Sequence, residues 1–391
     1  MSKIVAKTGN ESMAEAMRQI NPDVVAAYPI TPSTEIVQIF SSYVADGLVD
    51  TEFLAVESEH SAMSACIGSA ATGARTMTCT ASQGLALMWE MLYIATGLRL
   101  PIVIAGVNRA LSAPINIHCD HSDTMGIRDS GWIQIYSENA QEGYDNLIQA
   151  VKIAEECCLP AIVTTDGFII SHGMESMKLL EDKEVQDFIG DYKAPYTLIN
   201  PQKPITVGAL DFTDYYFEHR RSTAEAVLQA KDKIIKVSQE YSHLSQRKYE
   251  LFEEYRLDDA QMAIVVLGST AGTAKVVIDE LRSKGIKAGL LKIRVYRPFP
   301  AEELAIVLSK IPAVAILDRA DSLSTMGGPV FIDIKSALYN LEKRSKLINY
   351  IYGLGGRDTT LHHIREVYQD LQNILDTGKI AQSIKYLGVR E

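Results

Sequence analysis

The chain has 391 residues, of which 47% are hydrophobic and 22% charged, a composition typical of two or three globular domains. Its net charge of -11 and its scattered basic residues argue against nucleic-acid binding. We expect a cytosolic, soluble protein, because the N-terminus lacks a signal-peptide core and no apolar run reaches about 18 residues.

The cysteines lack the spacing of any common disulfide, zinc or cluster motif. None of the five forms a CxxC pair, and only two are adjacent. We therefore expect buried free thiols at Cys66, Cys79, Cys119, Cys157 and Cys158.

From residue 20 to about 172, short apolar runs such as VVAAYPI, RTMTCTA and PIVIAGV alternate with helical stretches. This alternation predicts an α/β domain with a largely parallel sheet. Asn10 and Ser12 are candidate N-caps of the first helix, and Gly47, Gly73 and Gly97 fall where helices should stop.

Residues 174–221 lose this rhythm and predict an irregular arm with an aromatic cluster at residues 212–217. Helix-forming residues from 222 to 254 predict a linker helix or helix pair. After residue 259 the alternation restarts, which predicts a second, smaller, open parallel sheet. The expected units are therefore 1–221, 222–258 and 259–391.

Polar residues that follow apolar strands are candidate site residues, because function collects at the carboxyl ends of parallel strands. In the turn YPITPSTE, Ser33 or Thr34 can cap a helix, and Glu35 lies in its first turn. Pro29 and Pro32 also fix the hydroxyl of Thr31 where it could bind a substrate carboxylate. A good helix start is the simpler interpretation of the same turn.

Two further turns precede helices. Glu59 begins a helix of small residues, where an exposed first-turn glutamate is the alternative to a buried functional one. Ser82 is a candidate N-cap, and Gly84 would allow close approach of a backbone or a cofactor ring.

A long polar loop follows the strand PIVIAGV. Arg109 could offer a fork to a carboxylate. His118, Asp120, His121 and Asp123 superficially resemble metal ligands, but we favour a hydrogen-bond network that holds the loop and expect no metal.

Several motifs are absent from the sequence: a GxxxxGK[ST] loop, a GxSxG elbow, a GxGxxG turn after a strand, and a GDG segment followed by paired asparagines. The chain thus has no obvious phosphate cradle of its own.

Five segments nevertheless carry a strong family resemblance: AYPITPSTEI, VESEHSAMSACIGSAATGARTMTCTASQGLALM, NRALSAPINIHCDHSD, YRPFP at 296–300 and GLGGRD at 353–358. Together they resemble the alpha subunit of 2-oxoacid:ferredoxin oxidoreductases, most closely the pyruvate branch. The resemblance implies a thiamine diphosphate-binding fold of the pyrimidine type, with a parallel sheet covered by helices on both faces. It also implies a smaller, transketolase C-terminal-like α/β domain, in which GLGGRD is structural or, as the alternative, part of an interface.

The resemblance also implies residue roles. Glu59 matches the glutamate that hydrogen-bonds N1′ of the aminopyrimidine, and Thr31 and Arg109 match the pair that binds the pyruvate carboxylate. We further expect cofactor contacts from Tyr28, Pro29 and Ser82.

The implied reaction is the reversible, coenzyme A-dependent oxidative decarboxylation of pyruvate to acetyl-CoA, with electrons passed to ferredoxin. A beta subunit would supply the diphosphate half of the site, and the beta, gamma and delta partner subunits would carry Mg²⁺ and the iron–sulfur clusters. The alternatives are a 2-oxoisovalerate or 2-oxoglutarate enzyme, a non-redox thiamine enzyme, or a scaffold subunit without catalytic residues.

Overall fold

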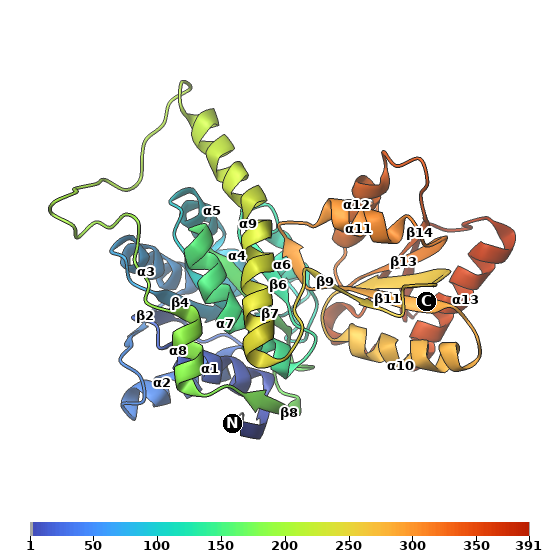
Figure 1. The fold of residues 1–391 in the computed structure, drawn as a ribbon, viewed down its shortest axis with the longest axis horizontal. Coiled ribbons are helices and arrows are strands. Elements are labelled where there is room, and N and C mark those ends of the chain that lie inside the picture. Colours follow the sequence, from blue (N-terminus) through green and yellow to red (C-terminus); the bar gives the residue numbers. More distant parts are fainter. Residues whose placement is uncertain (1–2, 391) are drawn as a thin grey trace.

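The computed structural model describes residues 3–390 and places two α/β bodies side by side (Figure 1). The first is built on a seven-stranded sheet with the order β12-β6-β7-β5-β4-β2-β3. All adjacent strands of this sheet run parallel except the pair β12 and β6, which is antiparallel. The predicted, largely parallel sheet is therefore confirmed. The strands are β2 (Val24–Ala27), β3 (Glu52–Ala55), β4 (Thr76–Thr80), β5 (Val103–Asn108), β6 (Ile133–Tyr136), β7 (Ala161–Asp166) and β12 (Val295–Arg297).

Helices cover both faces of this sheet, as predicted. Along β5, Val103 and Ala105 enter one core while Ile104 enters the other, because successive side chains of a strand point to opposite faces. The first core is covered by α1 (Gly9–Ile20), α2 (Thr34–Ala45) and α7 (Ala140–Cys157). The second is covered by α3 (Glu59–Ala71), α4 (Ser82–Leu87) and α5 (Trp89–Gly97).

The start of α1 differs from its prediction. Thr8 is the N-cap, and its hydroxyl accepts the N–H of Glu11 while the Glu11 carboxylate accepts the N–H of Thr8. Asn10 and Ser12 lie inside the helix, so their assignment as caps is wrong. The reciprocal Thr-x-x-Glu pattern of a capping box explains the earlier start.

The predicted irregular arm is shorter than expected. Residues 174–189 form β8 (Met174–Leu179), which pairs antiparallel with β1 (Lys3–Thr8), and α8 (Asp182–Ile189). The irregular part covers residues 190–215, and a single helix, α9 (Tyr216–Ser245), follows in place of a linker beginning at 222. In Figure 1 the arm and the first turns of α9 project beyond the first body. Phe212, Tyr215 and Phe217 there are 73%, 67% and 75% exposed, so this chain alone does not bury the aromatic cluster.

The second body contains a six-stranded sheet with the order β15-β14-β13-β10-β11-β9. It is parallel except at its edge strand β9. The strands are β9 (Phe252–Tyr255), β10 (Met262–Val266), β11 (Ala288–Ile293), β13 (Ala313–Asp318), β14 (Lys346–Tyr352) and β15 (Ile384–Leu387). One face carries α10 (Thr270–Ser283) and α13 (Leu361–Thr377), and the other carries α11 (Ala301–Leu308) and α12 (Pro329–Leu338).

The two bodies meet along a polar surface that we call the seam, formed by Lys292, Arg294, Arg319 and their partners. Lys292 lies within 2.6–2.8 Å of the carboxylates of Glu138, Glu142 and Glu253. Arg294 donates to Asn146 Oδ1 at 2.7 Å and to Gln149 Oε1 at 2.9 Å. Each of the three cations is at most 4% exposed and is hydrogen-bonded within the chain, as a buried charge requires.

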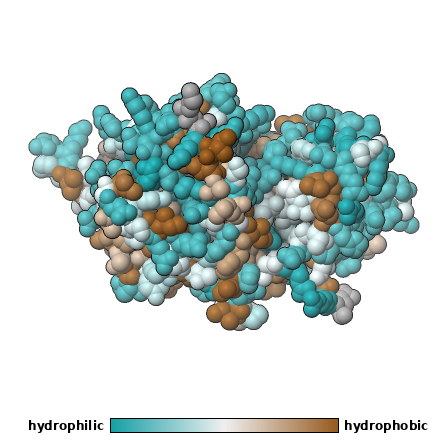
Figure 2. Space-filling model, turned by 90° about the horizontal axis from the view of Figure 1, so that it is seen from below, coloured by the Kyte–Doolittle hydropathy of each residue, from teal (hydrophilic) through white to brown (hydrophobic). Residues whose placement is uncertain are grey.

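No helix within residues 3–390 is long and apolar enough to cross a membrane. On the face shown in Figure 2, the apolar patches are separated by hydrophilic surface.

The five cysteines are free thiols, as predicted, and all are buried except Cys158, which is half-buried. Burial raises the pKa of Cys66 and Cys79 to about 12, so neither is a reactive thiolate at neutral pH.

Candidate functional site

The carboxyl ends of four adjacent strands, in the order β5-β4-β2-β3, bring the predicted site residues to one edge of the first sheet. We call this region the open edge; it consists of residues 28–35, 57–60, 78–89 and 108–124. Thr31 follows β2, Glu59 follows β3, Ser82 follows β4 and Arg109 follows β5. The parallel register therefore gathers residues that lie up to 78 positions apart in the sequence.

Glu59 is the first residue of α3. Ser58 is the N-cap, its hydroxyl accepting the N–H of Ser61 at 3.2 Å, so the backbone at Glu59 is fixed. The Glu59 side chain is only 6% exposed, and it has no hydrogen-bond partner within residues 3–390. A buried carboxylate without a partner in its own chain points to a partner from outside.

Gly84 leaves a small space in front of Glu59. A Cβ at position 84 would lie 2.6 Å from Glu59 Oε1 and less than 3.0 Å from Thr80 Oγ1. The Thr80 hydroxyl is buried and has no hydrogen-bond partner in the described part of the chain. A carboxylate and a hydroxyl that converge unpaired on a glycine fit the polar edge of a heteroaromatic ring, so these residues suit an aminopyrimidine.

Ser82 lies beside this space but does not cap its helix. The N-cap of α4 is Ala81, and Ser82 is the first helical residue, with a positive φ of 48°. Its hydroxyl lies 2.6 Å from the carbonyl oxygen of Ala110, which it can reach as a donor. Ser82 thus links the turn after β4 to the loop after β5.

Arg109 and Thr31 are in direct contact. Arg109 Nη1 donates to the backbone carbonyl of Thr31 at 2.9 Å, and Nε donates to the carbonyl of Asn116 at 2.9 Å. Arg109 is 7% exposed as a residue, and burial lowers the pKa of its guanidinium. Two of its five N–H groups are thereby used, so the outer edge of the fork can still bind a carboxylate.

The turn from Tyr28 to Glu35 lines the same edge. Tyr28 is 38% exposed, and Pro29 and Thr31 are also exposed. Ser33 occupies the N-cap of α2, but its hydroxyl bonds back to Ile30 O at 2.8 Å instead of capping the helix, while Glu35 lies in the first turn as predicted. The exposed side chains of the turn therefore face away from the core and are accessible to a ligand or partner.

The buried carboxylate of Asp123 holds the loop after β5 in place. Its carboxylate accepts the backbone N–H of Ser82 and of Arg109, both at 3.0 Å, and the Asn108 amide at 2.8 Å. Burial raises the pKa of Asp123 to about 6, although these donors act in the opposite direction. The expectation that the His118–Asp123 segment shapes the loop agrees with these contacts.

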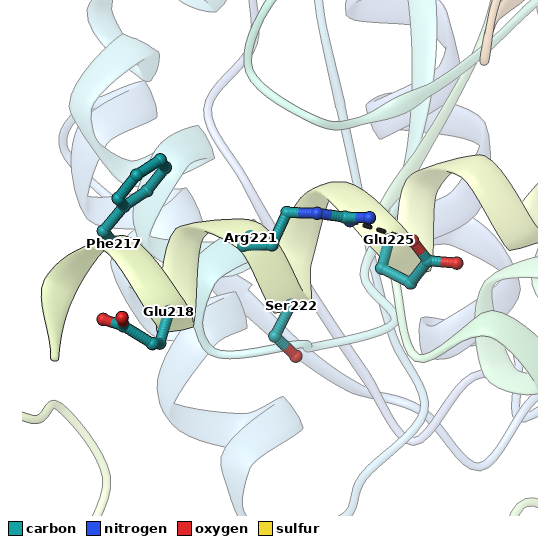
Figure 3. A pocket seen from close by; sticks show the side chains of 5 residues that line it. All are labelled: Phe217, Glu218, Arg221, Ser222 and Glu225. Atoms are coloured by element: carbon teal, nitrogen blue, oxygen red, sulfur yellow. Dashed lines mark ion pairs between the residues drawn. The ribbon is translucent and has the colours of Figure 1, made fainter.

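A surface hollow lies elsewhere, on the projecting part of α9 (Figure 3). It measures about 500 Å³ and is lined by Phe217, Glu218, Arg221, Ser222 and Glu225. All five belong to one helix, and Arg221 and Glu225 form an ion pair at 2.8 Å across one turn. Because one helix gives no opposing wall, we assign no small-molecule site to it.

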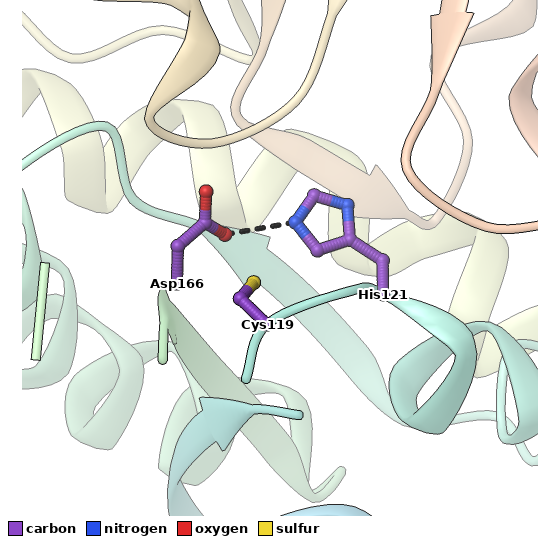
Figure 4. Close-up of side chains that lie close together, drawn as sticks. All are labelled: Cys119, His121 and Asp166. Carbon is purple, nitrogen blue, oxygen red and sulfur yellow. Dashed lines mark hydrogen bonds and ion pairs between the residues drawn. The ribbon is translucent and has the colours of Figure 1, made fainter. Parts of the chain in front are cut away.

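Cys119, His121 and Asp166 approach one another where the loop after β5 meets the second body (Figure 4). His121 Nε2 lies 2.8 Å from Asp166 Oδ1, and Asp166 Oδ2 accepts Arg319 Nη1 at 2.9 Å and the Ser269 hydroxyl at 2.5 Å. Burial alone would raise the pKa of Asp166, but His121 and Arg319 lower it well below its ordinary value. Both carboxylate oxygens are thus engaged, and one partner is a cation, so this cluster joins the two bodies and is not a suitable metal cage.

Two residues of the site, Thr80 and Asn116, were not predicted from the sequence, because they contribute through contacts with distant segments. Asp123 belongs to the segment expected to hold the loop, although its bond to Ser82 leaves no local pattern. The position of Thr80 at the end of an apolar strand was the one usable signal.

Comparison with known proteins agrees with this architecture. The family described as pyruvate flavodoxin/ferredoxin oxidoreductase, thiamine diP-bdg, matches residues 15–239, and pyruvate:ferredoxin oxidoreductase core domain II matches residues 260–364. "Pyruvate synthase subunit PorA" of Thermotoga maritima is 52% identical over 99% of this chain and 98% of its own length. "Ketoisovalerate oxidoreductase subunit VorA" of Pyrococcus abyssi is 41% identical over 99% and 97%.

A solved structure shares the fold. The chain aligns with a 2-oxoglutarate:ferredoxin oxidoreductase from Magnetococcus marinus with a TM-score of 0.73 and 18% identity, covering 94% of this chain and 65% of that one. At this identity the likeness concerns the fold alone, and this chain spans about two thirds of that protein's length. The family match and the full-length relatives go further: the chain belongs to the pyruvate flavodoxin/ferredoxin oxidoreductase family.

Proposed function

We propose that this chain supplies the pyrimidine-facing half of a thiamine diphosphate site in a multi-subunit pyruvate:ferredoxin oxidoreductase. The complex oxidatively decarboxylates pyruvate, forms acetyl-CoA from coenzyme A, and passes the electrons to ferredoxin. The observation that carries this proposal is the buried, unpartnered Glu59 facing Gly84 and Thr80 in a chain of this family.

The roles of the residues follow from their positions. We assign Glu59 to N1′ of the aminopyrimidine, where it holds a proton that the reaction requires, and we assign Thr80 to a polar atom of the same ring. When bound, thiamine diphosphate supplies the carbanion chemistry that a protein side chain cannot. Tyr28, Pro29 and Ser82 line the cofactor side of the open edge.

Arg109 and Thr31 bind the carboxylate of the substrate. The two carbonyl contacts hold the guanidinium in one orientation before substrate arrives, so little rotamer freedom is lost on binding. The exposed hydroxyl of Thr31 supplies a second donor beside the fork.

Partner subunits complete the site. The chain lacks a GDG motif for the diphosphate and Mg²⁺ and a CxxC motif for a cluster, so we assign Mg²⁺ and iron–sulfur clusters to beta, gamma and delta subunits. In the helices that begin near Gly84, Leu87 and Trp89 are 51% and 50% exposed, and this apolar surface suits a tightly packed neighbour.

Pyruvate is the proposed substrate because a pyruvate synthase subunit is 52% identical, whereas a ketoisovalerate oxidoreductase subunit is 41% identical. That second match makes 2-oxoisovalerate the alternative. A branched substrate needs a wider pocket, so relative kcat/KM for the two oxoacids distinguishes these assignments.

The deciding experiment compares Glu59→Gln with Glu57→Gln in the purified complex, measuring pyruvate- and coenzyme A-dependent reduction of a low-potential acceptor. Glu57 is exposed and bonds Ser61 in the same turn, so it is a matched control. We expect turnover to fall on the order of 100-fold or more only in Glu59→Gln. Equal turnover in both variants would overturn the assignment and leave a scaffold role.

A further inference from the structure

Asp123 fixes the ends of the loop that carries the Arg109 contact, but the middle of this loop is largely exposed. Residues 112–115, 117 and 118 are exposed, including Ile115 at 78%. Yet this loop supplies the Asn116 carbonyl that fixes Arg109 Nε at 2.9 Å. Contacts from outside the first body would therefore add to the rigidity of the middle of the loop.

That support comes from the second body. The turn formed by residues 353–356 includes a 3₁₀ helix (Leu354–Gly356) and contacts the loop at three points. Asn116 Nδ2 donates to Gly355 O at 3.0 Å, the Gly355 N–H donates to Asp120 Oδ2 at 3.1 Å, and the Gly356 N–H donates to Cys119 O at 2.6 Å. A fourth bond, from His121 N–H to Arg319 O at 2.7 Å, closes the loop's far end.

Only glycine fits this turn. Gly355 and Gly356 have φ values of 60° and 79°, in the left-handed region. A Cβ at Gly355 would lie less than 3.0 Å from Asn116 Nδ2, and a Cβ at Gly356 less than 3.0 Å from His118 Cβ. Both backbone conformation and close approach therefore require the glycine pair.

We infer that the second body positions the substrate-binding side of the site: the glycine turn, acting through Asn116, fixes the loop that orients Arg109. Asn116 is the connecting residue, because its side chain bonds the turn while its carbonyl bonds the guanidinium. Asn116, Gly355 and Gly356 are positioning residues. This inference rests on the proposed function of Arg109 as the carboxylate ligand.

The test uses Gly356→Ala, with Gly285→Ala as the matched control, both in the assembled complex. Gly285 lies in the same body with the same φ of 79° but has no atom within 4 Å of its added Cβ, so it carries the backbone cost alone. We expect Gly356→Ala and Asn116→Ala to raise the KM for pyruvate about 10-fold or more. The dissociation constant of thiamine diphosphate should stay unchanged, and Gly285→Ala should keep the wild-type KM.

Arg109→Lys separates this inference from the proposed function. It retains the charge but loses the fork, so it should raise the KM itself. Adding Asn116→Ala to Arg109→Lys should then raise the KM no further, because the two residues act in series.

If Arg109→Lys leaves the KM unchanged, the proposed role of Arg109 fails. If Arg109→Lys raises the KM but Gly356→Ala and Asn116→Ala do not, the positioning role alone is wrong. Losses of stability or assembly in Gly356→Ala, with an unchanged KM in the assembled fraction, would also overturn it.

Discussion

The seam and the open edge are both built from buried polar residues, but they differ in how those residues are satisfied. At the seam, Lys292, Arg294 and Arg319 have their hydrogen bonds within the chain, and His121 Nδ1 is an exception. At the open edge, the Glu59 carboxylate and the Thr80 hydroxyl have no partner within residues 3–390, and apolar side chains are exposed beside them. The seam is thus a completed interface, whereas the open edge is one side of an interface.

Among the variants that test this difference between the regions, Gly84→Ala should have the largest effect on activity. The added Cβ would displace the Glu59 carboxylate, so thiamine diphosphate binding and turnover of the complex should fall on the order of 100-fold. Calorimetric titration with the cofactor checks the binding. Gly97→Ala, at the exposed end of α5 with no atom within 4 Å of the new Cβ, should change neither quantity.

Asp166→Asn should cost about 3–5 kcal/mol of unfolding free energy, because Arg319 would remain buried beside a neutral group. Urea denaturation of the isolated chain measures this loss. By contrast, Glu59→Gln breaks no contact within the chain and should change stability by less than about 0.5 kcal/mol. Similar losses in both variants would contradict the distinction between the regions.

Trp89→Ala should weaken assembly without unfolding the chain. Trp89 is 50% exposed next to the site, and truncation of an aromatic side chain in a subunit interface costs about 2 kcal/mol or more of binding. Analytical ultracentrifugation of the reconstituted complex gives the affinity. Tyr339→Ala removes an aromatic side chain that is 70% exposed on the second body and serves as the control.

The pH dependence should have opposite signs in the two regions. Asp166 has a lowered pKa, so its contribution to stability is present above its unfolded pKa of about 3.8 and is lost as pH falls. Asp123 has a pKa raised to about 6, so its contribution is present below about 3.8 and is lost as pH rises through 6. Unfolding free energies measured from about pH 2 to pH 8 check both signs. Asp166→Asn should flatten the loss of stability below about pH 3.8, and Asp123→Asn should flatten the loss between about pH 3.8 and 6.

Local patterns predicted much of this architecture. Strand ends correctly placed Thr31, Glu59, Ser82 and Arg109 at one edge of the sheet, because parallel strands carry their carboxyl ends to the same side. Whether these residues act as proposed stays a prediction.

The remaining features depend on contacts between distant segments. Asp123 bonds Ser82 across 41 positions, and Asn116 bonds Gly355 across 239, so neither contact leaves a local pattern. The prediction of an irregular segment at residues 174–189 is wrong, because β8 and α8 are short and bury their apolar side chains against distant helices, among them α1, α7 and α9.

The strand β12 has a consequence for how the protein can be divided. It lies in the second half of the sequence, yet Val295 pairs with Ile135 at the outer margin of the first sheet. Without β12, β6 would become an exposed edge strand whose free backbone N–H and C=O groups could pair with other molecules. A gene cut near residue 259 would therefore yield two fragments prone to aggregation, and we expect the intact chain to unfold as one cooperative unit.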